Sequence, residues 1–440
     1  MATFRIVTLG CKLNQADSSA LEARLVLLGL RRAPSGSTPA DLVVLNTCTV
    51  TGNADREARQ ITRRLRRANP QAVLIATGCY AERDAGALRR LPQVDDVVGM
   101  RDQAARVAAV AADALGLVSP AVPNDLGPFG ATRACDSPAD PEGRTRAYLK
   151  IQDGCDLRCS YCIIPSVRGD SRSLIPDHVL RRLAEMTEHG YREIVFTGVN
   201  TGDYGRDLDP PLRLHDLLPR ALRVAGVGRL RLNSLEPKTV TDGVIELLAT
   251  HGGRLARHLQ IPLQSGSDSV LARMHRPYRV RDYTRVTGAL RHAIPEIALG
   301  ADVIVGFPGE TEEEFSETLH FIESSSLNYL HVFSYSPRPG TAAADRTDHL
   351  PSVVIRERSA RLRMLARTLS LRFRQRFLGH TLPVLTLREI RSDGRLRALS
   401  DNYIDMGIDL DGRNPGPLFN QLLTARITEV TEDQTVASLA

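Results

Sequence analysis

Long apolar runs and a secretion signal are both missing from the sequence. No stretch approaches the roughly 20 consecutive apolar residues that span a bilayer. The N-terminus also lacks the basic region and apolar core of a signal peptide. These absences argue against an integral membrane protein and a secreted one, so we expect a cytoplasmic protein with no membrane partner.

Lysine is scarce, although basic residues are not. Of 57 basic residues only Lys12, Lys150 and Lys238 are lysines, and the net charge is +6. Genomic base composition explains such a bias. A nucleic-acid partner would explain it too, because arginine is the better partner for phosphates and stacked bases. The charge therefore permits nucleic-acid binding without requiring it.

The 440 residues leave room for two or three domains. Residues 1–115 alternate short apolar runs with helical stretches, which predicts an α/β domain built on a parallel sheet. The expected strands are 4–9, 42–45, 73–76 and 94–98, and the expected helices are 18–28, 55–68, 81–90 and a stretch from about 102. Residues 116–146 are rich in Pro, Gly and Asp and are expected to form a linker.

Residues 147–378 repeat this alternation six times. The pattern predicts an open (β/α)6 relative of the (β/α)8 barrel, a partial TIM barrel, with its site at the C-terminal strand ends. The expected strands are 147–151, 193–197, 229–233, 258–262, 300–305 and 329–334, and the expected helices are 177–189, 213–225, 241–251, 281–292, 311–324 and 352–377. In the tail, 379–440, four short strands at 382–387, 395–399, 403–408 and 422–430 predict a small β-barrel.

The seven cysteines are an odd number in a chain expected to be cytoplasmic, so ligands are favoured over disulfides. Three of them, Cys155, Cys159 and Cys162, have the spacing C-x₃-C-x₂-C directly after the first barrel strand. Three close thiolates can hold three corners of a cubane cluster, whereas zinc ordinarily takes a fourth protein ligand. We expect an iron–sulfur cluster with one iron open to an external ligand.

Cys11, Cys48 and Cys79 are far apart in sequence, yet each closes an expected strand of the first domain. Neighbouring parallel strands end at the same edge of a sheet, so the three thiols should converge there. Each alone would be interpreted as a buried core cysteine, which is the usual place of a free cysteine. Together they predict a second metal site. Cys135 lies in the linker and is expected to be an incidental thiol.

The triad at 155–162, with Tyr161 before its last cysteine, resembles the motif of radical S-adenosylmethionine (SAM) enzymes. In that family the open iron binds SAM, whose reductive cleavage gives a 5′-deoxyadenosyl radical. The resemblance implies SAM contacts at the strand ends, although each residue alone would pass for a polar or glycine loop position. These residues are Tyr161, Gly198, Asn200, Ser234, Glu236, Gln264, Val303, Gly306 and Pro308.

Motifs in the first half of the chain narrow the resemblance to one family, the methylthiotransferases. Their N-terminal domain is resembled by Gly10-Cys11-Lys12-Leu13-Asn14, Asn46-Thr47-Cys48-Thr49-Val50 and Ala76-Thr77-Gly78-Cys79. Residues 148–155, with Ile163-Ile164-Pro165 and Arg168-Gly169 downstream, also resemble this family. The tail resembles the TRAM module, a small RNA-binding barrel. A departure at residues 170–173 leaves the role of Arg172 open.

This resemblance implies two [4Fe–4S] clusters and two SAM per turnover. A sulfur at the Cys11/Cys48/Cys79 cluster would be methylated by one SAM. The radical from the other SAM would abstract hydrogen from an unactivated adenine C2, where the methylthio group then couples. An electron donor such as flavodoxin or ferredoxin, and a monomeric enzyme, are expected.

Branches of the family act on threonylcarbamoyl-adenosine in tRNA, on isopentenyl-adenosine in tRNA, or on an aspartate of a ribosomal protein. The neighbours of Cys11 and Cys48 look most like the threonylcarbamoyl branch, whose target is position 37 in the anticodon arm. For contacts to substrate and RNA we expect Lys12, Asn14, Arg168 and an arginine face on helix 55–68 formed by Arg56, Arg59, Arg63 and Arg67. A merely solvated charged face would have the same pattern.

Three other functions remain open on the sequence. The isopentenyl branch is the nearest of them. Another radical-SAM enzyme, including one that inserts sulfur, could carry an auxiliary relay cluster in its N-terminal domain. A non-enzymatic iron–sulfur protein that senses redox state and binds RNA would leave the barrel-rim residues unused, and SAM cleavage by the reduced protein separates it from any of the enzymes.

Overall fold

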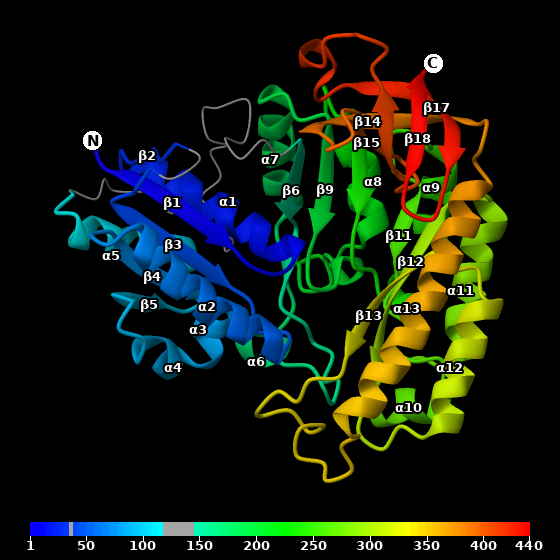
Figure 1. The fold of residues 1–440 in the computed structure, drawn as a ribbon, viewed down its shortest axis with the longest axis horizontal. Helices are drawn as coiled ribbons and strands as arrows, with labels where there is room; N and C mark the ends of the chain where they lie inside the picture. The colour runs from blue at the N-terminus through cyan, green and yellow to red at the C-terminus, as the bar shows by residue number, and fades with distance from the viewer. Residues whose placement is uncertain (35–37, 118–144) are drawn as a thin grey trace.

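The computed structural model describes residues 1–34, 38–117 and 145–440. Figure 1 shows three parts along the chain: a parallel sheet with helices in blue and cyan, a central barrel in green and yellow, and a small barrel in orange and red. Most of the expected linker, including Cys135, falls outside the described residues.

The first part is a parallel sheet, as predicted. It has five strands, in the order β2-β1-β3-β4-β5. Its strands are β1 (Thr3–Thr8), β2 (Arg31–Arg32), β3 (Leu42–Thr47), β4 (Val73–Gly78) and β5 (Asp96–Val98). Its helices are α1 (Lys12–Leu27), α2 (Gly52–Ala68), α3 (Cys79–Arg83), α4 (Ala85–Arg89) and α5 (Gln103–Ala114). Strand β3 is buried along its whole length because separate apolar clusters cover the two faces of the sheet.

Two predictions for this domain were wrong in detail. The helix expected at 18–28 begins at Lys12, since the chain turns into α1 directly after Cys11. The helix expected at 81–90 is two short helices, because Asp84 leaves the helical conformation and its side chain accepts a hydrogen bond from the Ala87 N–H at 2.9 Å. The short edge strand β2 was not predicted.

The central part is the open barrel that the sequence predicted. Its strands are β6 (Arg146–Lys150), β9 (Glu193–Thr197), β10 (Arg229–Leu232), β11 (His258–Gln260), β12 (Ala298–Val305) and β13 (Tyr329–Ser334). They form two parallel sheets, β10-β9-β6 and β11-β12-β13, joined by a bridge between Leu230 and Leu255. The outer helices are α7 (Pro176–Glu188), α8 (Leu214–Leu222), α9 (Asp242–Thr250), α11 (Val280–Ala293), α12 (Glu312–Ser324) and α13 (Ser352–Gln375).

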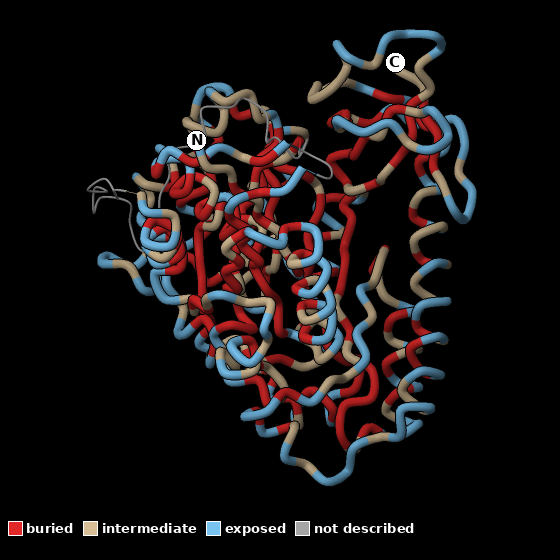
Figure 2. Tube along the Cα trace, turned by 60° about the vertical axis from the view of Figure 1, so that its left-hand side comes forward, coloured by how far each residue is buried: buried red, intermediate tan, exposed pale blue. Residues whose placement is uncertain are grey.

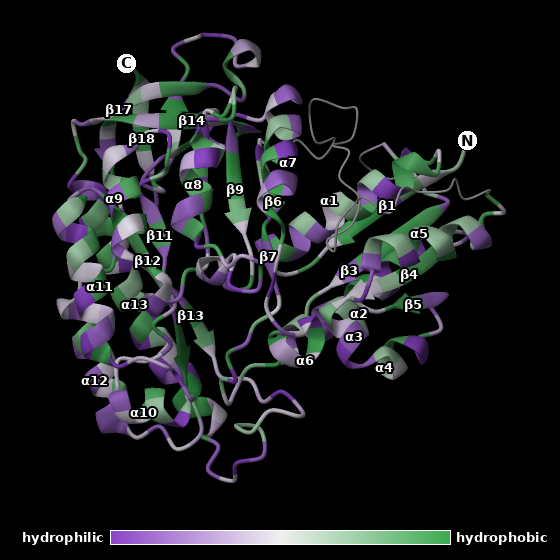
Figure 3. Ribbon diagram, turned by 180° about the vertical axis from the view of Figure 1, so that it is seen from behind, coloured by the Kyte–Doolittle hydropathy of each residue, from purple (hydrophilic) through white to green (hydrophobic). Residues whose placement is uncertain are grey.

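Short elements complete this part, at the ends of the strands. They are β7 (Gln152–Asp153), α6 (Ile164–Arg168), β8 (Arg172–Ser173) and α10 (Asp268–Arg273). Strands β6 and β13 are the open edges of the barrel, and the first sheet lies beside β6 (Figure 1). Buried residues follow the central strands and exposed residues follow the outer helices (Figure 2). Figure 3 shows the matching division by hydropathy.

The tail is a closed barrel in the order β14-β15-β16-β18-β17. Its strands are β14 (Thr381–Ile390), β15 (Leu396–Ser400), β16 (Asp405–Asp409), β17 (Leu422–Val430) and β18 (Thr435–Leu439). The sequence predicted four strands; the fifth, β18, pairs with both β16 and β17 and closes the barrel. No helix in the described part of the chain combines the length and apolar character needed to cross a membrane.

Candidate active site: two cysteine triads

The first triad lies at one edge of the first sheet. Cys11 follows β1 and precedes α1, Cys48 follows β3, and Cys79 opens α3 after β4. Strands β1, β3 and β4 are parallel neighbours, so their carboxyl ends bring the three cysteines together. Gly10, at φ +89°, makes room for this approach, because a Cβ there would lie 2.6 Å from the Cys48 Sγ.

Asn14 connects the three strand ends. Its Nδ2 donates to the carbonyls of Leu9 at 2.8 Å and Thr47 at 3.0 Å, which belong to the segments that carry Cys11 and Cys48. Its Oδ1 lies 4.0 Å from the Sγ of both Cys11 and Cys79. The amide therefore lies beside the Cys11 and Cys79 thiols, and its hydrogen bonds tie together the loops that carry Cys11 and Cys48.

The second triad lies on the loop that follows β7. Cys155 and Cys159 are buried and Cys162 is half-buried. Backbone hydrogen bonds fix the loop: Cys155 N–H donates to the Gly169 carbonyl at 3.0 Å, and Ser160 N–H donates to the Met274 carbonyl at 3.1 Å. The loop is thus preorganised by contacts with two distant segments of the same domain.

Burial raises the pKa of four of the six thiols. The pKa is raised to about 12 for Cys48 and Cys162, and to about 11 for Cys79 and Cys155. These thiols are protonated at neutral pH in the metal-free protein. Iron must therefore displace protons when a cluster assembles.

A cavity of about 320 Å³ opens beside the second triad. Its lining combines the triad with polar groups from the ends of several barrel strands, namely Cys155, Cys159, Cys162, Tyr161, Asn200, Ser234, Glu236 and Gln264. Ser234 and Gln264 have φ values of 56° and 65°, a strained conformation for residues other than glycine, and such strain concentrates at functional sites. Of the nine expected SAM contacts, five line this cavity: Tyr161, Asn200, Ser234, Glu236 and Gln264.

The other four expected SAM contacts, Gly198, Val303, Gly306 and Pro308, lie outside this lining within the described chain. A Cβ at Gly198 would lie 2.6 Å from the Gln152 Oε1, and one at Gly306 would lie 2.5 Å from the Ile355 Cγ1 on α13. At Gly306 the space that a side chain would need is therefore taken by a helix of the protein itself.

Arg276 is a site residue that the sequence reasoning missed. It is buried, and its Nη1 donates to the Cys159 Sγ at 3.1 Å. It also forms an ion pair with Glu236 and donates from Nε to the Tyr278 Oη at 3.2 Å. Its place after α10 follows no spacing rule, so no sequence signal pointed to it.

The residues present fit the iron–sulfur clusters that the sequence suggested. Each site offers three soft thiol ligands, the donors that iron–sulfur clusters take. The cavity beside the second site also holds an unused polar atom: the Tyr335 Oη is buried and has no hydrogen-bond partner among the described residues. Within that same part of the chain, no three His, Cys, Asp or Glu side chains form a group that could hold a single metal ion.

The expected contacts to substrate and RNA differ in how far they are exposed. Arg56, Arg63 and Arg67 are exposed on α2, and Arg59 is half-buried and donates to the Tyr80 Oη at 2.8 Å. Asn14 and Arg168 are instead buried and bonded to protein groups, which argues against a direct RNA contact. Lys12 is partly buried, and burial lowers its pKa.

Comparisons with known proteins agree with this arrangement. Residues 149–322 match the Radical SAM superfamily, and residues 3–99 match "Uncharacterized protein family UPF0004". In its fold the chain is similar to the radical SAM methyltransferase TsrM from Kitasatospora setae, solved with cobalamin and a [4Fe–4S] cluster. The TM-score is 0.55 at 16% identity, over 78% of this chain and 77% of that one.

Curated relatives cover most of the chain. It is 38% identical to the threonylcarbamoyladenosine tRNA methylthiotransferase MtaB of Bacillus subtilis, over 92% of this chain and 90% of that one. It is 36% identical to MtaB of Thermotoga maritima, over 88% and 86%. It is 35% identical to the tRNA-2-methylthio-N(6)-dimethylallyladenosine synthase of Thermobifida fusca, over 92% and 82%. The chain belongs to the radical-SAM methylthiotransferase family, enzymes whose cofactors are SAM and [4Fe–4S] clusters.

Proposed function

We propose that this enzyme methylthiolates C2 of N6-threonylcarbamoyladenosine at position 37 of tRNA and uses two SAM per turnover. Relatives named for the threonylcarbamoyl nucleoside match at 33–38% identity, and relatives named for the dimethylallyl nucleoside match at 34–35%. Identity alone separates the two substrates only weakly. The environment of Lys12 supports the choice of the threonylcarbamoyl substrate.

Lys12 reaches from the first triad into the barrel. It follows Cys11, and its Nζ donates to the Asn233 Oδ1, after the end of β10, at 3.1 Å. The Nζ also lies 5.5 Å from the centre of the Tyr403 ring. Neither partner is an anion, although a partly buried ammonium ion is stabilised most by a negative charge.

The charged groups near Lys12 favour binding of an anionic ligand beside it. The ion pairs of Arg146, Arg229 and Arg231 in the described structure all go to one carboxylate, Glu193. The threonylcarbamoyl group carries a carboxylate, whereas the isopentenyl group is uncharged and apolar. We infer that Lys12 binds the threonyl carboxylate. The observation that carries the choice of substrate is that the partly buried Lys12 ammonium group, among the described residues, contacts an amide oxygen and an aromatic ring but no carboxylate.

The site residues have separate roles in this proposal. When bound, the clusters and SAM supply the radical and the methylthio group. Cys11, Cys48 and Cys79 would hold one cluster, and Cys155, Cys159 and Cys162 the other. Asn200, Ser234, Glu236 and Gln264, which line the cavity, would orient SAM through their polar groups.

The proposed partners follow from this reaction. The anticodon arm of tRNA is the substrate, and a flavodoxin or ferredoxin donates electrons. We propose a monomeric, cytoplasmic enzyme, as expected for a protein that modifies tRNA.

The substrate is tested with two tRNAs that differ only at position 37, one carrying threonylcarbamoyladenosine and one carrying isopentenyladenosine. Mass spectrometry of nucleosides should show a methylthio product from the first. Lys12→Met should raise the KM for that tRNA by about tenfold or more, and Lys238→Met, at an exposed lysine, serves as the control. Conversion of the isopentenyl tRNA, with the threonylcarbamoyl tRNA left unmodified, would contradict the proposal.

A further inference from the structure

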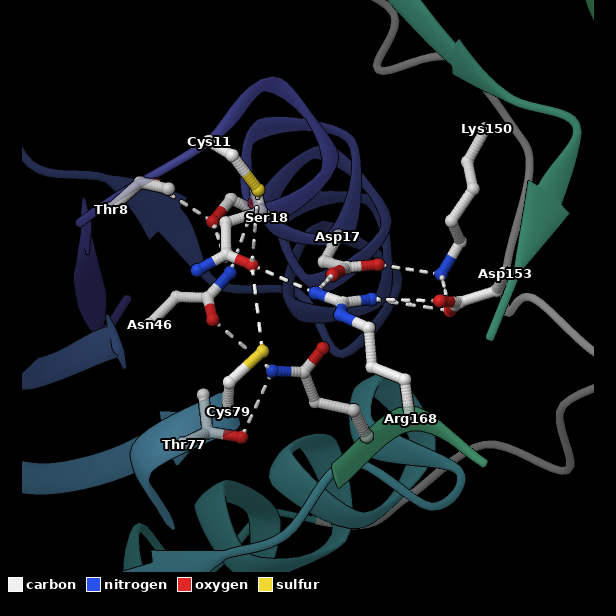
Figure 4. Close-up of polar contacts among 12 residues, drawn as sticks. Thr8, Cys11, Asp17, Ser18, Asn46, Thr77, Cys79, Lys150, Asp153 and Arg168 are labelled. Carbon is white, nitrogen blue, oxygen red and sulfur yellow. Dashed lines mark hydrogen bonds and ion pairs between the residues drawn. The ribbon is translucent and has the colours of Figure 1, made fainter. Parts of the chain in front are cut away.

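Arg168 ends α6, six residues after Cys162, and its side chain is almost completely buried. Its Nη1 lies 3.0 and 3.2 Å from the two carboxylate oxygens of Asp153. Its Nη2 donates to the Asn14 Oδ1 at 2.7 Å and to the Asp17 Oδ2 at 2.8 Å (Figure 4). One guanidinium group of the radical-SAM domain thus binds two residues of α1, in the first domain.

Lys150 completes a buried group of four charges. Its Nζ lies 2.5 Å from the Asp17 Oδ1 and 3.0 Å from the Asp153 Oδ2. Two cations therefore face two carboxylates. Asp17 comes from the first domain, and Asp153 precedes Cys155 by two residues. These ion pairs join the domain of the first triad to the loop of the second.

The bond to Asn14 extends this connection to the first thiols. Arginine only donates hydrogen bonds, so the amide oxygen of Asn14 must face Arg168. The Nδ2 then faces the Leu9 and Thr47 carbonyls, as the structure has it. Arg168 thereby fixes the orientation of the amide that lies between Cys11 and Cys79.

The segment that carries Arg168 also covers the first triad. Cys79 is buried in a small apolar cluster with Ile163 and Val167, which belong to the segment that follows Cys162. The segment that follows Cys162 therefore packs against Cys79 of the first triad as well. A shift of α6 would move the covering of Cys79 and the end of the second loop together.

We propose that Arg168 is a positioning residue that, through Asn14 and Asp17, fixes the first cysteine triad relative to the second. Its role follows from the two-site chemistry of the family and does not depend on which nucleoside is modified. A fixed separation matters because the group transferred at one site must meet the carbon activated at the other. A misplacement of about 1 Å costs up to about a hundredfold in rate.

A second contact keeps the domains docked when Arg168 is altered. Arg338, after β13, forms an ion pair with Asp55 of α2 at 3.0 Å and donates to the Thr49 carbonyl at 3.0 Å. Arg168→Lys keeps the charge but removes the planar fork that reaches Asp153, Asp17 and Asn14 together. A change in the position of the first triad relative to the second can therefore be measured in a variant that still folds.

The first experiment needs no RNA. Full-length protein with Cys155, Cys159 and Cys162 replaced by Ala is reconstituted with iron and sulfide, and the EPR spectrum of its reduced first cluster is recorded. Arg168→Lys and Asn14→Ala should each shift this spectrum. In the metal-free chain with all cysteines present, both should speed alkylation of Cys79 and leave Cys155 unchanged. Arg220→Lys, at an exposed arginine of α8 paired with Asp177 at 2.9 Å, is the matched control.

The second experiment separates positioning from general damage. In the reconstituted enzyme, Arg168→Lys should slow methylthio transfer by about tenfold to a hundredfold while SAM cleavage falls much less. Adding Asn14→Ala to Arg168→Lys should cost little more, because both act through one contact. Equal loss of iron from both sites, or a folded Arg168→Lys protein with unchanged EPR, alkylation and transfer, would overturn the proposal. Neither outcome bears on the choice of nucleoside.

Discussion

Arg231 and Glu193 form an ion pair inside the barrel, with the Arg231 Nε 2.9 Å from the Glu193 Oε1 and both side chains fully buried. Glu193 also pairs with Arg229 at 3.3 Å. Arg231 donates in addition to the Ser400 and Asp401 carbonyls at 3.0 Å, so the same guanidinium anchors the tail barrel. This carboxylate therefore supports the core of the barrel and the docking of the tail.

Glu193→Gln should destabilise the protein by about 3–5 kcal/mol, because it leaves buried arginines without their carboxylate. Burial alone would raise the pKa of Glu193, but the charge and hydrogen bonds of Arg231, with Arg229 and Arg146, lower it to about 2. The stabilisation is present above the ordinary glutamate pKa of about 4.3 and is lost as the pH falls towards 2. The free energies of unfolding of the native protein and of Glu193→Gln, measured in urea, should therefore begin to approach each other below about pH 4 and meet only near pH 2.

Asp170→Asn is the control for this comparison. Asp170 pairs with Arg158 at 2.6 Å, but both side chains are largely exposed. Its loss should change stability by less than about 1 kcal/mol. An equal effect of the two substitutions would show that burial does not govern the Glu193 contact.

Iron content tests the two cysteine sites. Anaerobically reconstituted protein should hold about eight irons if each triad takes a four-iron cluster. Replacing Cys155, Cys159 and Cys162 with Ala should leave about four irons and abolish 5′-deoxyadenosine formation from SAM. Continued formation of 5′-deoxyadenosine would place the radical site elsewhere.

The first triad is tested separately. Replacing Cys11, Cys48 and Cys79 with Ala should abolish methylthio transfer but preserve reductive SAM cleavage, because the second triad has its own ligands on another domain. Product nucleosides and 5′-deoxyadenosine are measured in the same reaction. A variant that still methylthiolates tRNA would reduce the first site to a structural or relay role.

The arginine face of α2 should bind phosphates. If it does, tRNA affinity falls with salt, and Arg63→Ala should reduce the slope of log affinity against log salt by about one. Arg89→Ala, at an exposed arginine of α4, removes the same charge away from this face. Identical slopes for the two variants would indicate that α2 is only a solvated surface.

The order of strands and helices could be predicted because it rests on local patterns. Val43 and Leu45 pack on one side of the first sheet while Leu42 and Val44 pack on the other, so β3 is a continuous apolar run that the sequence displays directly. Strand β18 was missed because five residues with little periodicity carry a weak signal. Its pairing with β16 and β17 makes it a strand.

The grouping of six cysteines into two triads could be predicted from local pattern. Cys155, Cys159 and Cys162 lie within one short loop, and the parallel-strand rule brings Cys11, Cys48 and Cys79 to one edge. The residues that surround these cysteines could be found only in the folded structure. Arg168 was expected at RNA and is buried 2.7 Å from Asn14, which lies 154 positions away in the chain. The direction of a long side chain depends on the charges and space that folding brings to it, and spacing along the sequence carries no record of those partners.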